Sequence, residues 1–522
     1  MVANAGVLPA RRWTGAIVRG RELSGDVDLD VDAVVVGTGA GGSVALRELA
    51  RAGLNVVALE EGAWSTSADF DQREDHMLPR LFQDMGGRAT EDMGIRVLQG
   101  RGVGGSTVHN TNLCKRTPEP ILELWARSHG VSGAAVADLA PSFEAIEADL
   151  SVSEIPADAR NANNDLLRAG CDALGWRGAP LRHNRVGCQK SGFCELGCAY
   201  DAKQNALKVI VPQAVAAGAR VYADTEAVRI EHDGQRVTGV RAVARGAGGD
   251  VVASVNVRAR VVVLAASAVG SAALARKSGV PDPHGRVGRG LRVHPGAVVA
   301  GRFERAIEGW HGIPQSYECT EHLSYEPGSD RRVWIVPAFA HPIGAAASTP
   351  GFGAAHMRAM RTYPNLAVLT AMVHDETSGE VLVGDDGRPI LRYAMSDADR
   401  AQLARGLAAC ARLLLAAGAT DVSIPAIPSR RVASVAELDA LDLSFVRPHA
   451  VPVTAVHPMG TMCMGDDPRA SVVSSAGEHH QLRGLFVSDG SLFPTSLGGP
   501  PQISVYAFAL HLAPHVVARA RG

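Results

Sequence analysis

The fold of this chain is decided by residues 31–62, which read VDAVVVGTGAGGSVALRELARAGLNVVALEEG. The stretch opens with the apolar, β-branched run 33–36, which is typical of a buried parallel strand. A G-x-G-x-x-G turn follows over 37–42, and then a helical segment of small and apolar residues over 43–52. A second apolar strand, 54–59, completes a β-α-β unit. This order predicts the start of a doubly wound α/β domain.

The glycines of the turn have separate physical roles. Gly37 allows the tight turn, Gly39 lets the backbone approach a pyrophosphate, and Gly42 lets the helix pack closely on the strand. Glu60 ends the second strand about 20 residues further on, where a carboxylate suits hydrogen bonds to a ribose hydroxyl. A glycine-rich turn without a ligand would not explain this acid. The unit therefore predicts a dinucleotide site, without saying which dinucleotide is bound.

Length and composition restrict the class of protein. A chain of 522 residues is too long for one simple core. The formal net charge of −2 gives no basic footprint for nucleic acid. No apolar run is long enough to cross a bilayer, and the N-terminus does not have the pattern of a signal peptide. We therefore expect a cytoplasmic protein with no transmembrane segment and no nucleic-acid partner.

The rest of the chain shows a change of character near residue 300. We read residues 1–30 as an irregular lead-in, and 300–455 as strands and helices of a substrate domain. The hairpin pattern over 380–393 is assigned to that domain. The last helix is expected over 502–519, with Pro514 kinking or breaking it near its end.

The chain resembles the glucose-methanol-choline (GMC) flavoprotein oxidoreductases over nearly its whole length. The matching blocks are GTGAGG…LEEG, GRGVGGSTVHN, AASAVGSAALARKSGV, HPMGTMCMG and LFVSDGSLFPTSLGGPPQISVYAFAL. The resemblance implies FAD rather than NAD, and a Rossmann-like FAD-binding domain with a doubly wound parallel sheet beside an α+β substrate-binding domain. The FAD contacts that it implies are Gly37, Gly39, Gly42, Glu60, Arg101, Gly104, Gly105, Asn110, Val228, Asp489 and Gln502.

We divide the chain accordingly. The expected segments are 25–116, the first FAD-binding segment; 117–205, a cap or substrate-side insertion with a cysteine cluster; 206–299, the second FAD-binding segment; 300–454, the substrate-binding domain; and 455–522, the third FAD-binding segment, which holds the catalytic histidine.

Alcohol oxidation by a flavin needs a base for the hydroxyl proton while hydride leaves the carbon for flavin N5, and histidine has a suitable pKa. His457 matches the catalytic base of the family. The second active-site residue of the family, usually Asn or His, corresponds here to Pro500, which has no side-chain donor or acceptor. His449 is a substitute candidate by proximity in sequence alone.

His109 follows the spacing Gly104-Gly105-Ser106-Thr107-Val108-His109-Asn110. In the choline-oxidising branch of the family, a similar pattern carries a histidine bonded to the flavin C8 methyl group. A covalent bond between His109 and FAD is therefore our hypothesis. The alternative is a histidine that only hydrogen-bonds near the cofactor.

Cys188, Cys194 and Cys198 have ferredoxin-like spacing, with Ser191 at the position of the second of four cysteines. Three thiolates would suit a 3Fe-4S cluster, as proposed for a similar segment in FAD-dependent sugar dehydrogenases. The alternatives are buried free thiols or one disulfide. Relatives resembling long-chain alcohol oxidases have a similar segment without an assigned metal.

The leading function is therefore FAD-dependent oxidation of a small-molecule alcohol, with oxygen, a quinone or a redox protein as electron acceptor. Because Pro500 departs from the family pattern, a second hypothesis is a flavoprotein of this fold with lyase or decarboxylase chemistry. A noncatalytic electron-transfer subunit is a third, which the His457 motif disfavours. The Ala-rich substrate region mildly favours a hydrophobic alcohol.

Overall fold

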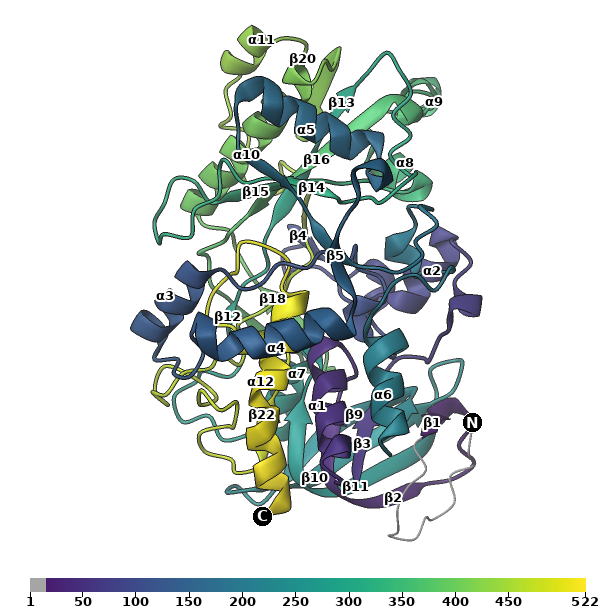
Figure 1. Cartoon of the computed structure of the whole chain (residues 1–522), viewed down its shortest axis with the longest axis vertical. Coiled ribbons are helices and arrows are strands. Elements are labelled where there is room, and N and C mark those ends of the chain that lie inside the picture. Colours follow the sequence, from purple (N-terminus) through teal and green to yellow (C-terminus); the bar gives the residue numbers. More distant parts are fainter. Residues whose placement is uncertain (1–15) are drawn as a thin grey trace.

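A computed structural model describes residues 16–522 and shows two sheet-based halves stacked along the long axis of the molecule (Figure 1). The lower half is built on an eight-stranded sheet of order β1-β8-β3-β2-β11-β10-β9, with β22 also paired to β11. Its strands from β1 to β11 and β22 are parallel, and β10 and β9 continue antiparallel. The bounds are β1 (Ala16–Arg19), β2 (Val27–Val36), β3 (Val56–Leu59), β8 (Arg220–Ala223), β9 (Thr225–His232), β10 (Val237–Arg245), β11 (Val251–Leu264) and β22 (Leu485–Val487).

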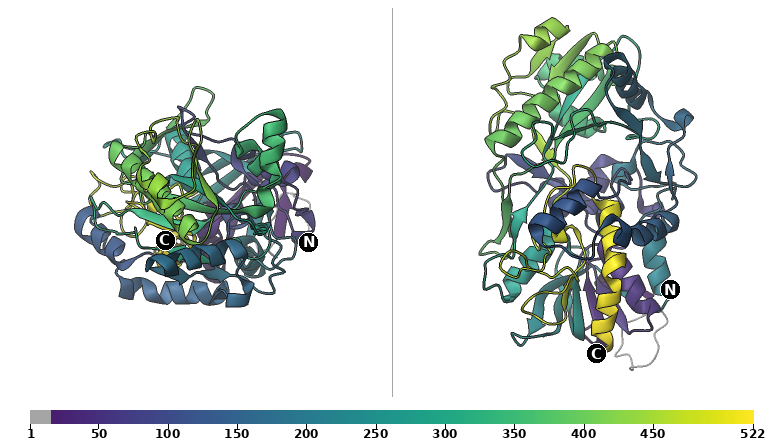
Figure 2. Two further views of the ribbon diagram at one scale, coloured as in Figure 1. Left: turned by 90° about the horizontal axis from the view of Figure 1, so that it is seen from above. Right: turned by 60° about the vertical axis from the view of Figure 1, so that its left-hand side comes forward.

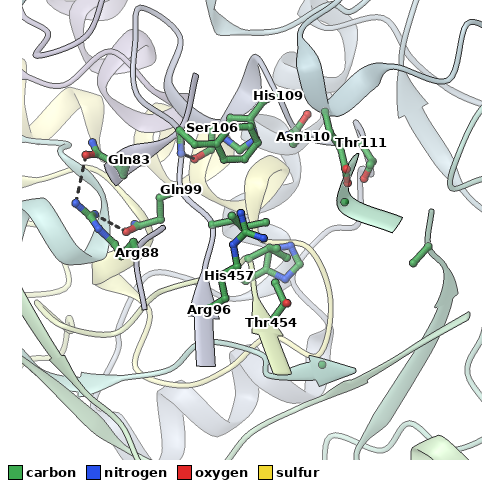
Figure 3. A pocket seen from close by; sticks show the side chains of 18 of the residues that line it. Gln83, Arg88, Arg96, Gln99, Ser106, His109, Asn110, Thr111, Thr454 and His457 are labelled. Carbon is green, nitrogen blue, oxygen red and sulfur yellow. Dashed lines mark hydrogen bonds between the residues drawn. The ribbon is translucent and has the colours of Figure 1, made fainter. Parts of the chain in front are cut away.

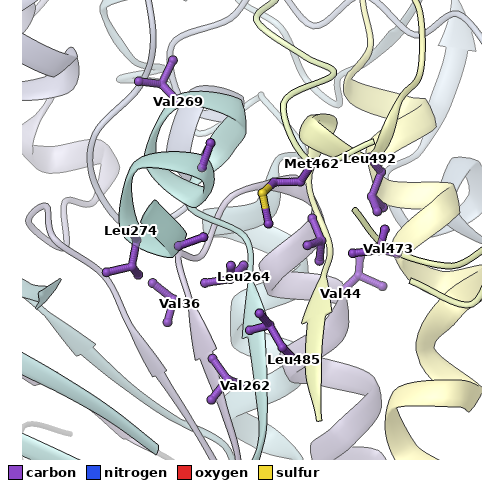
Figure 4. Close-up of a cluster of buried hydrophobic side chains, with 14 of the residues drawn as sticks. Val36, Val44, Val262, Leu264, Val269, Leu274, Met462, Val473, Leu485 and Leu492 are labelled. Carbon is purple, nitrogen blue, oxygen red and sulfur yellow. The ribbon is translucent and has the colours of Figure 1, made fainter. Parts of the chain in front are cut away.

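Helices cover both faces of this sheet, which confirms the predicted Rossmann-like class. The helices are α1 (Ala40–Arg51), α6 (Val211–Ala216), α7 (Ser267–Ser278) and α12 (Gln502–Arg521). Ala33 and Val35 pack in a cluster with α1, α6 and α12. Val36 faces the other way, beside Val269 and Leu274 of α7 (Figure 4). Burial on both faces explains the continuous apolar run of β2.

The prediction of an irregular lead-in over 1–30 is wrong for the described residues, while residues 1–15 lie outside them. β1 pairs with β8, and β2 begins at Val27 rather than near residue 33. Val27, Leu29 and Val31 are buried, while the aspartates between them face outward, and Asp28 accepts a hydrogen bond from Asn256. The alternation of apolar and acidic residues is a period-2 strand signal that the high charge obscured.

The upper half is built on a nine-stranded sheet of order β20-β19-β13-β16-β15-β14-β6, with β21 joining β13 to β4. α5 (Ala162–Leu174) and α10 (Asp397–Ala416) pack against it, and Figure 2 shows α10 crossing the top of the molecule. The strand bounds are β4 (Ile95–Val97), β6 (Gly178–Pro180), β13 (Gly296–Arg302), β14 (Tyr317–Cys319), β15 (Val333–Pro337), β16 (Leu366–Val373), β19 (Asp421–Ile424), β20 (Arg430–Val432) and β21 (Val453–Ala455).

The predicted hairpin lies in the other half of the molecule from the one we expected. Strands β17 (Gly379–Val383) and β18 (Pro389–Arg392) pair with β12 (Arg289–Leu291) and contact α7. The buried Val381 and Leu391 belong to the same core as β2. The segment 300–454 therefore contributes to both halves, because the chain returns to the lower half before α10.

The last helix lies where the sequence predicts it, but Pro514 does not break it. α12 runs from Gln502 to Arg521 without a break at Pro514. It packs between α1 and α4 (Val136–Asp149), and residues on both sides of the proline, such as Leu512 and Val516, are buried. Burial of these side chains stabilises the helix by more than it loses through the one backbone hydrogen bond that Pro514 cannot donate. Among residues 16–522, α12 is the helix whose length and composition would suit a membrane span, and 61% of that window is buried inside the protein.

Candidate active site

A cavity of about 1460 Å³ lies where the lower sheet meets the upper one. The ends of β2 and β3, at Val36 and Leu59, line it from below. Val298 of β13 and Thr370 of β16 line it from above. The cavity exceeds the usual size of a small-ligand pocket, so it has room for a large cofactor together with a substrate.

The first glycine turn forms one end of this cavity. Gly37 has φ +96°, and a Cβ atom there would lie 2.3 Å from the carbonyl oxygen of Ala265. At Gly41 the Cβ would lie 1.7 Å from the carbonyl oxygen of Ser488. Gly42 faces the strand instead, where its Cβ would lie 2.1 Å from the Gly37 oxygen. The bare backbone at the N-terminus of α1, with Gly39 on the cavity wall, fits the pyrophosphate of a dinucleotide.

Glu60 lines the cavity but is already engaged by the protein. One carboxylate oxygen accepts hydrogen bonds from the Thr38 amide (3.0 Å) and hydroxyl (2.8 Å), and the other from the amides of Gly62 (3.1 Å) and Gly102 (3.2 Å). Burial raises the pKa of Glu60 to about 7. Glu60 therefore ties three loops together at the expected ribose position, a structural role that sequence reasoning missed.

The second glycine-rich loop closes over the first. Gly104 and Gly105 have φ values of +95° and +53°, and a Cβ at Gly105 would lie 2.9 Å from the Gly39 Cα atom. Gly105 lines the cavity, whereas Arg101 turns away and donates a hydrogen bond to the Glu61 carbonyl (3.2 Å). The close approach explains why both loops need glycine.

Val228 lies beside the cavity rather than on its wall. The register between β9 and β10 shifts there, because Arg241 pairs with Arg229 but Ala242 pairs with Ala227. Val228 is thus the extra residue of a β-bulge. The cavity wall at this point is formed by Glu226 and Ala227.

Asp489, Asn110 and Gln502 meet the cavity from the C-terminal segment and the second loop. The buried Asp489 accepts hydrogen bonds from the hydroxyls of Ser271 and Ser491, which links α7 to the turn after β22. Asn110 donates to Gln502 at the first turn of α12 (2.7 Å). These contacts fix the helix N-terminus at the cavity, where its positive end suits an anionic group.

His109 lies on the cavity wall (Figure 3). Its ring centroid is 4.0 Å from that of Phe82. The residue is 7% exposed, and its buried Nε2 has no hydrogen-bond partner within residues 16–522. Burial first, and the charge of Lys203 second, lower the pKa of His109 to about 3. The imidazole is therefore neutral, and its Nε2 is buried next to the cavity wall without a partner in the described chain.

His457 lines the cavity, and a second histidine stands behind it. The Nδ1 atoms of His457 and His294 are 3.2 Å apart, with the rings nearly perpendicular. Burial and the neighbouring His294 hold the pKa of His457 well below its ordinary value. Sequence reasoning missed His294, which is separated from His457 along the chain by seven strands of the upper sheet and by the hairpin.

The hydrogen bonds around His294 fix its tautomer. Its Nε2 accepts hydrogen bonds from the amides of Leu497 (3.2 Å) and Gly498 (3.1 Å), so this nitrogen carries no proton. The proton of neutral His294 is then on Nδ1, which donates to Nδ1 of His457. Neutral His457 consequently carries its proton on Nε2, which has no partner among the described residues.

His294 is held in a strained backbone conformation. It is 1% exposed and has φ +51°, which is uncommon for a residue other than glycine. Asp375 accepts hydrogen bonds from the amides of His294 (3.2 Å) and Val293 (3.0 Å), and from the hydroxyl of Tyr393 (2.8 Å). Strain maintained by such a network is typical of functional sites.

Pro500 lies on the cavity wall just before α12, as the sequence register predicts. The expectation for His449 is wrong. His449 is exposed on the surface, where its Nε2 lies 3.5 Å from a carboxylate oxygen of Asp92, and it does not line the cavity. Proximity in sequence did not bring it near His457, because β21 separates the two residues.

The iron–sulfur hypothesis is not supported. No three His, Cys, Asp or Glu side chains among residues 16–522 are grouped so that they could hold a metal ion. The three sulfurs accept hydrogen bonds from different groups instead: Cys188 from the Lys190 amide, Cys194 from Arg185, and Cys198 from the Ala202 amide. The spacing matches a ferredoxin, but the backbone between the cysteines does not bring the three sulfurs together.

Fold and site together define a dinucleotide-binding oxidoreductase. The two domain models of the GMC oxidoreductases match residues 31–296 and 376–509. An uncharacterized GMC-type oxidoreductase of Mycobacterium tuberculosis is 35% identical over 500 residues, covering 94% of this chain and 76% of that protein. The chain belongs to the GMC oxidoreductase family, which confirms the resemblance seen in the sequence.

More distant relatives have named activities. The long-chain-alcohol oxidase FAO1 of Arabidopsis thaliana is 28% identical over 508 residues, or 92% of this chain and 66% of that protein. Pyridoxine 4-oxidase from Mesorbium loti has a similar fold, with a TM-score of 0.70, 21% identity, and coverage of 93% and 98% of the two chains. A formate oxidase from Aspergillus oryzae has a TM-score of 0.67 at 14% identity, covering 94% and 99%.

Proposed function

We propose that this protein catalyses the FAD-dependent oxidation of an alcohol to a carbonyl compound. One observation supports the proposal most directly: His457 lines the same cavity as the two glycine loops, and its Nε2 has no hydrogen-bond partner in the described chain. Gly39, Gly41, Asn110 and Gln502 would hold FAD there, because the glycine loops leave backbone bare and the helix N-terminus meets the cavity. FAD supplies the acceptor for the hydride.

The residues of the chain would supply binding and proton chemistry. In the base mechanism, the hydroxyl proton of the substrate would pass to Nε2 of His457 after the hydrogen bond from His294 has broken and left this nitrogen unprotonated, and FAD would supply the hydride acceptor. Pro500 offers no donor at the neighbouring position, so His457 alone would hold the substrate oxygen. The N-terminus of α12 would stabilise negative charge on the reduced cofactor.

The wall of the cavity supports a hydrophobic alcohol as substrate. Val298, Met372 and Phe339 line its upper region, above His457. The relative named a long-chain-alcohol oxidase supports the same substrate class. The names of the similar oxidases also support molecular oxygen as electron acceptor.

We further propose that FAD is attached covalently through His109, because its buried Nε2 lacks a partner in the described chain. The bond would join Nε2 to the C8 methyl carbon of the flavin, and one methyl C–H bond would break. Molecular oxygen would accept the two electrons released in this step, together with one proton from the methyl group and one from the imidazole, and hydrogen peroxide would form.

A second candidate function is favoured by the tautomer of His457. A base must offer an unprotonated nitrogen, yet the hydrogen bond from His294 leaves the proton on Nε2. In this state His457 donates a hydrogen bond to the ligand, and base action would require the bond to His294 to break. A donor histidine beside Pro500 fits a flavoprotein of this fold with lyase or decarboxylase chemistry.

Anaerobic flavin reduction separates the two candidates. Purified holoenzyme is mixed with aliphatic alcohols of increasing chain length, terpenols, sterols and sugars, and the absorbance of oxidised flavin is followed. Bleaching by an alcohol, with formation of the matching carbonyl, supports alcohol oxidation. An absence of bleaching with every alcohol, from a protein that holds FAD, would reject it in favour of the second candidate.

A further inference from the structure

The segment with the three cysteines wraps behind the loop that carries His109. Its Lys203 is 3% exposed, and its ammonium group donates hydrogen bonds to the backbone carbonyls of Val108 (2.8 Å), Asn110 (2.5 Å) and Cys194 (2.8 Å). An ammonium group has three protons, so these bonds use its full capacity. The segment with the three cysteines does not form a metal site within residues 16–522, so a different role is needed to explain why it carries a buried lysine with three hydrogen bonds.

Two of the three carbonyls belong to the residues on either side of His109. Holding both carbonyls restricts the backbone before and after His109, and therefore limits the directions that its side chain can take. The same segment makes a second contact with this loop, because the Ala206 amide donates a hydrogen bond to the Thr107 hydroxyl (3.2 Å). Residues 203–206 thus hold the loop 107–110 from behind, while the imidazole of His109 faces the cavity (Figure 3).

Lys203 also acts through its charge. Burial lowers the pKa of Lys203 to about 8, and Cys194, Cys198 and Glu195 oppose this shift, so the group is mainly protonated at neutral pH. The positive charge of Lys203 adds to the effect of burial and lowers the pKa of His109 further. Arg185 is the other cation that acts on Lys203, and it points to Cys194 and to the Thr111 carbonyl.

We propose that Lys203 is the positioning residue for attachment of the flavin: it holds the backbone carbonyls of Val108 and Asn110, the two residues that flank His109, so that the imidazole is directed at the flavin methyl group. The inference rests on the covalent link proposed above. It also gives the cysteine-containing segment a role, since this segment delivers Lys203 and the Cys194 carbonyl to the back of the loop.

The test follows attachment itself rather than activity. Wild type, K203Q, K203R and H109A are prepared without flavin, mixed with FAD in air, and sampled over time. Intact-protein mass and acid precipitation measure the covalent fraction, and gel filtration measures total bound FAD. K208Q is the matched control, because Lys208 lies in the same segment but pairs with Asp201 near the surface.

We expect wild type and K208Q to attach FAD at similar rates and H109A to attach none. K203Q should bind FAD but attach it at least tenfold more slowly, with partial recovery in K203R, which keeps the charge. In wild type, the attachment rate should also decline as the pH rises through about 8, where Lys203 loses its proton. That decline should be missing in K203Q.

Attachment by K203Q at the wild-type rate would overturn the inference. If K203Q does not fold, an absence of the decline near pH 8 in wild type would overturn it as well. Wild-type protein that is reduced by an alcohol but releases all its FAD on acid precipitation would reject the covalent link and the role of Lys203. The proposed alcohol oxidation would stand in that case.

Discussion

At the scale of single residues, the site depends on three histidines that are all held neutral, of which His109 and His294 are buried and His457 is half-buried on the cavity wall. His109 and His294 have pKa values of about 3, and that of His457 is well below its ordinary value, in each case mainly through burial. Neutral imidazoles can donate through one nitrogen and accept through the other. The role of each histidine is therefore set by which nitrogen its neighbours occupy.

Replacing His457 tests whether it takes part in the reaction. If His457 is the base, H457A should slow anaerobic flavin reduction by an alcohol by about 10²–10⁴-fold, with FAD still bound. H449Q is the control, because His449 is an exposed residue away from the cavity. Stopped-flow measurement of flavin absorbance gives both rates, and equal rates for H457A and wild type would contradict the assigned role.

Replacing His294 tests the tautomer of His457. Nitrogen-15 NMR of histidine-labelled protein should show the proton of His457 on Nε2 in the wild type. H294L removes the Nδ1–H donor, so the proton of His457 should redistribute between both nitrogens and its pKa should rise. A wild-type spectrum with the proton on Nδ1 would show that the proposed hydrogen bond from His294 is absent.

At the scale of elements, the start of α1 is the region that the sequence describes best. The strand, turn and helix are local, so the glycine spacing alone predicts their geometry. The reason for Gly41 is not local, however, because the atom that excludes a side chain there is the carbonyl oxygen of Ser488, at the end of β22. Two segments far apart in sequence thus meet at the pyrophosphate site.

G41A should displace the N-terminus of α1 from Ser488, because the added Cβ would lie 1.7 Å from that oxygen. We expect the affinity for FAD to fall at least tenfold and the melting temperature to drop. G25A is a suitable control, since a Cβ at Gly25 would have no neighbour within 4 Å among the described atoms. FAD titration by fluorescence quenching measures the affinity, and unchanged binding by G41A would contradict the proposed approach.

At the scale of the whole molecule, the two sheets meet at a cavity whose walls come from most of the chain. The lower sheet supplies the glycine loops, and the upper sheet supplies Val298 and Thr370. The chain crosses between the halves several times, as the hairpin β17–β18 illustrates. Residues that act together, such as His294 and His457, are therefore distant in sequence.

The buried histidines should make the whole protein sensitive to acid. His109 and His294 have folded pKa values of about 3, below the ordinary value of 6.5, so the unfolded chain binds more protons below pH 6.5. Their contribution to stability is complete above pH 6.5 and is lost as the pH falls toward 3, by at most about 1.4 kcal/mol per pH unit for each histidine. The raised pKa of Glu60, about 7, acts in the opposite direction over the same pH range, so the test compares variants. In urea unfolding of the flavin-free protein, the change in free energy of unfolding from pH 7.5 to 5.5 should be less destabilising in H109Q than in wild type, and an identical change would contradict the assigned contribution.

The class of fold, the dinucleotide turn and the family can all be predicted from the order of residues along the chain. These depend on local spacing, because glycine conformation, strand periodicity and helix boundaries are properties of short segments. The sequence also singled out His109, His457 and Pro500, since they lie in short motifs. It misjudged the strand at Val27, whose charged face hid the alternation.

Contacts between side chains from distant segments became visible with the folded structure. It paired His294 with His457, placed Lys203 behind His109, kept the three cysteine sulfurs from forming a metal site, and left His449 on the surface. Each of these contacts joins segments that approach only when the sheets assemble. Spacing along the chain carries no information about them, because the physical reason for each contact is packing between distant elements.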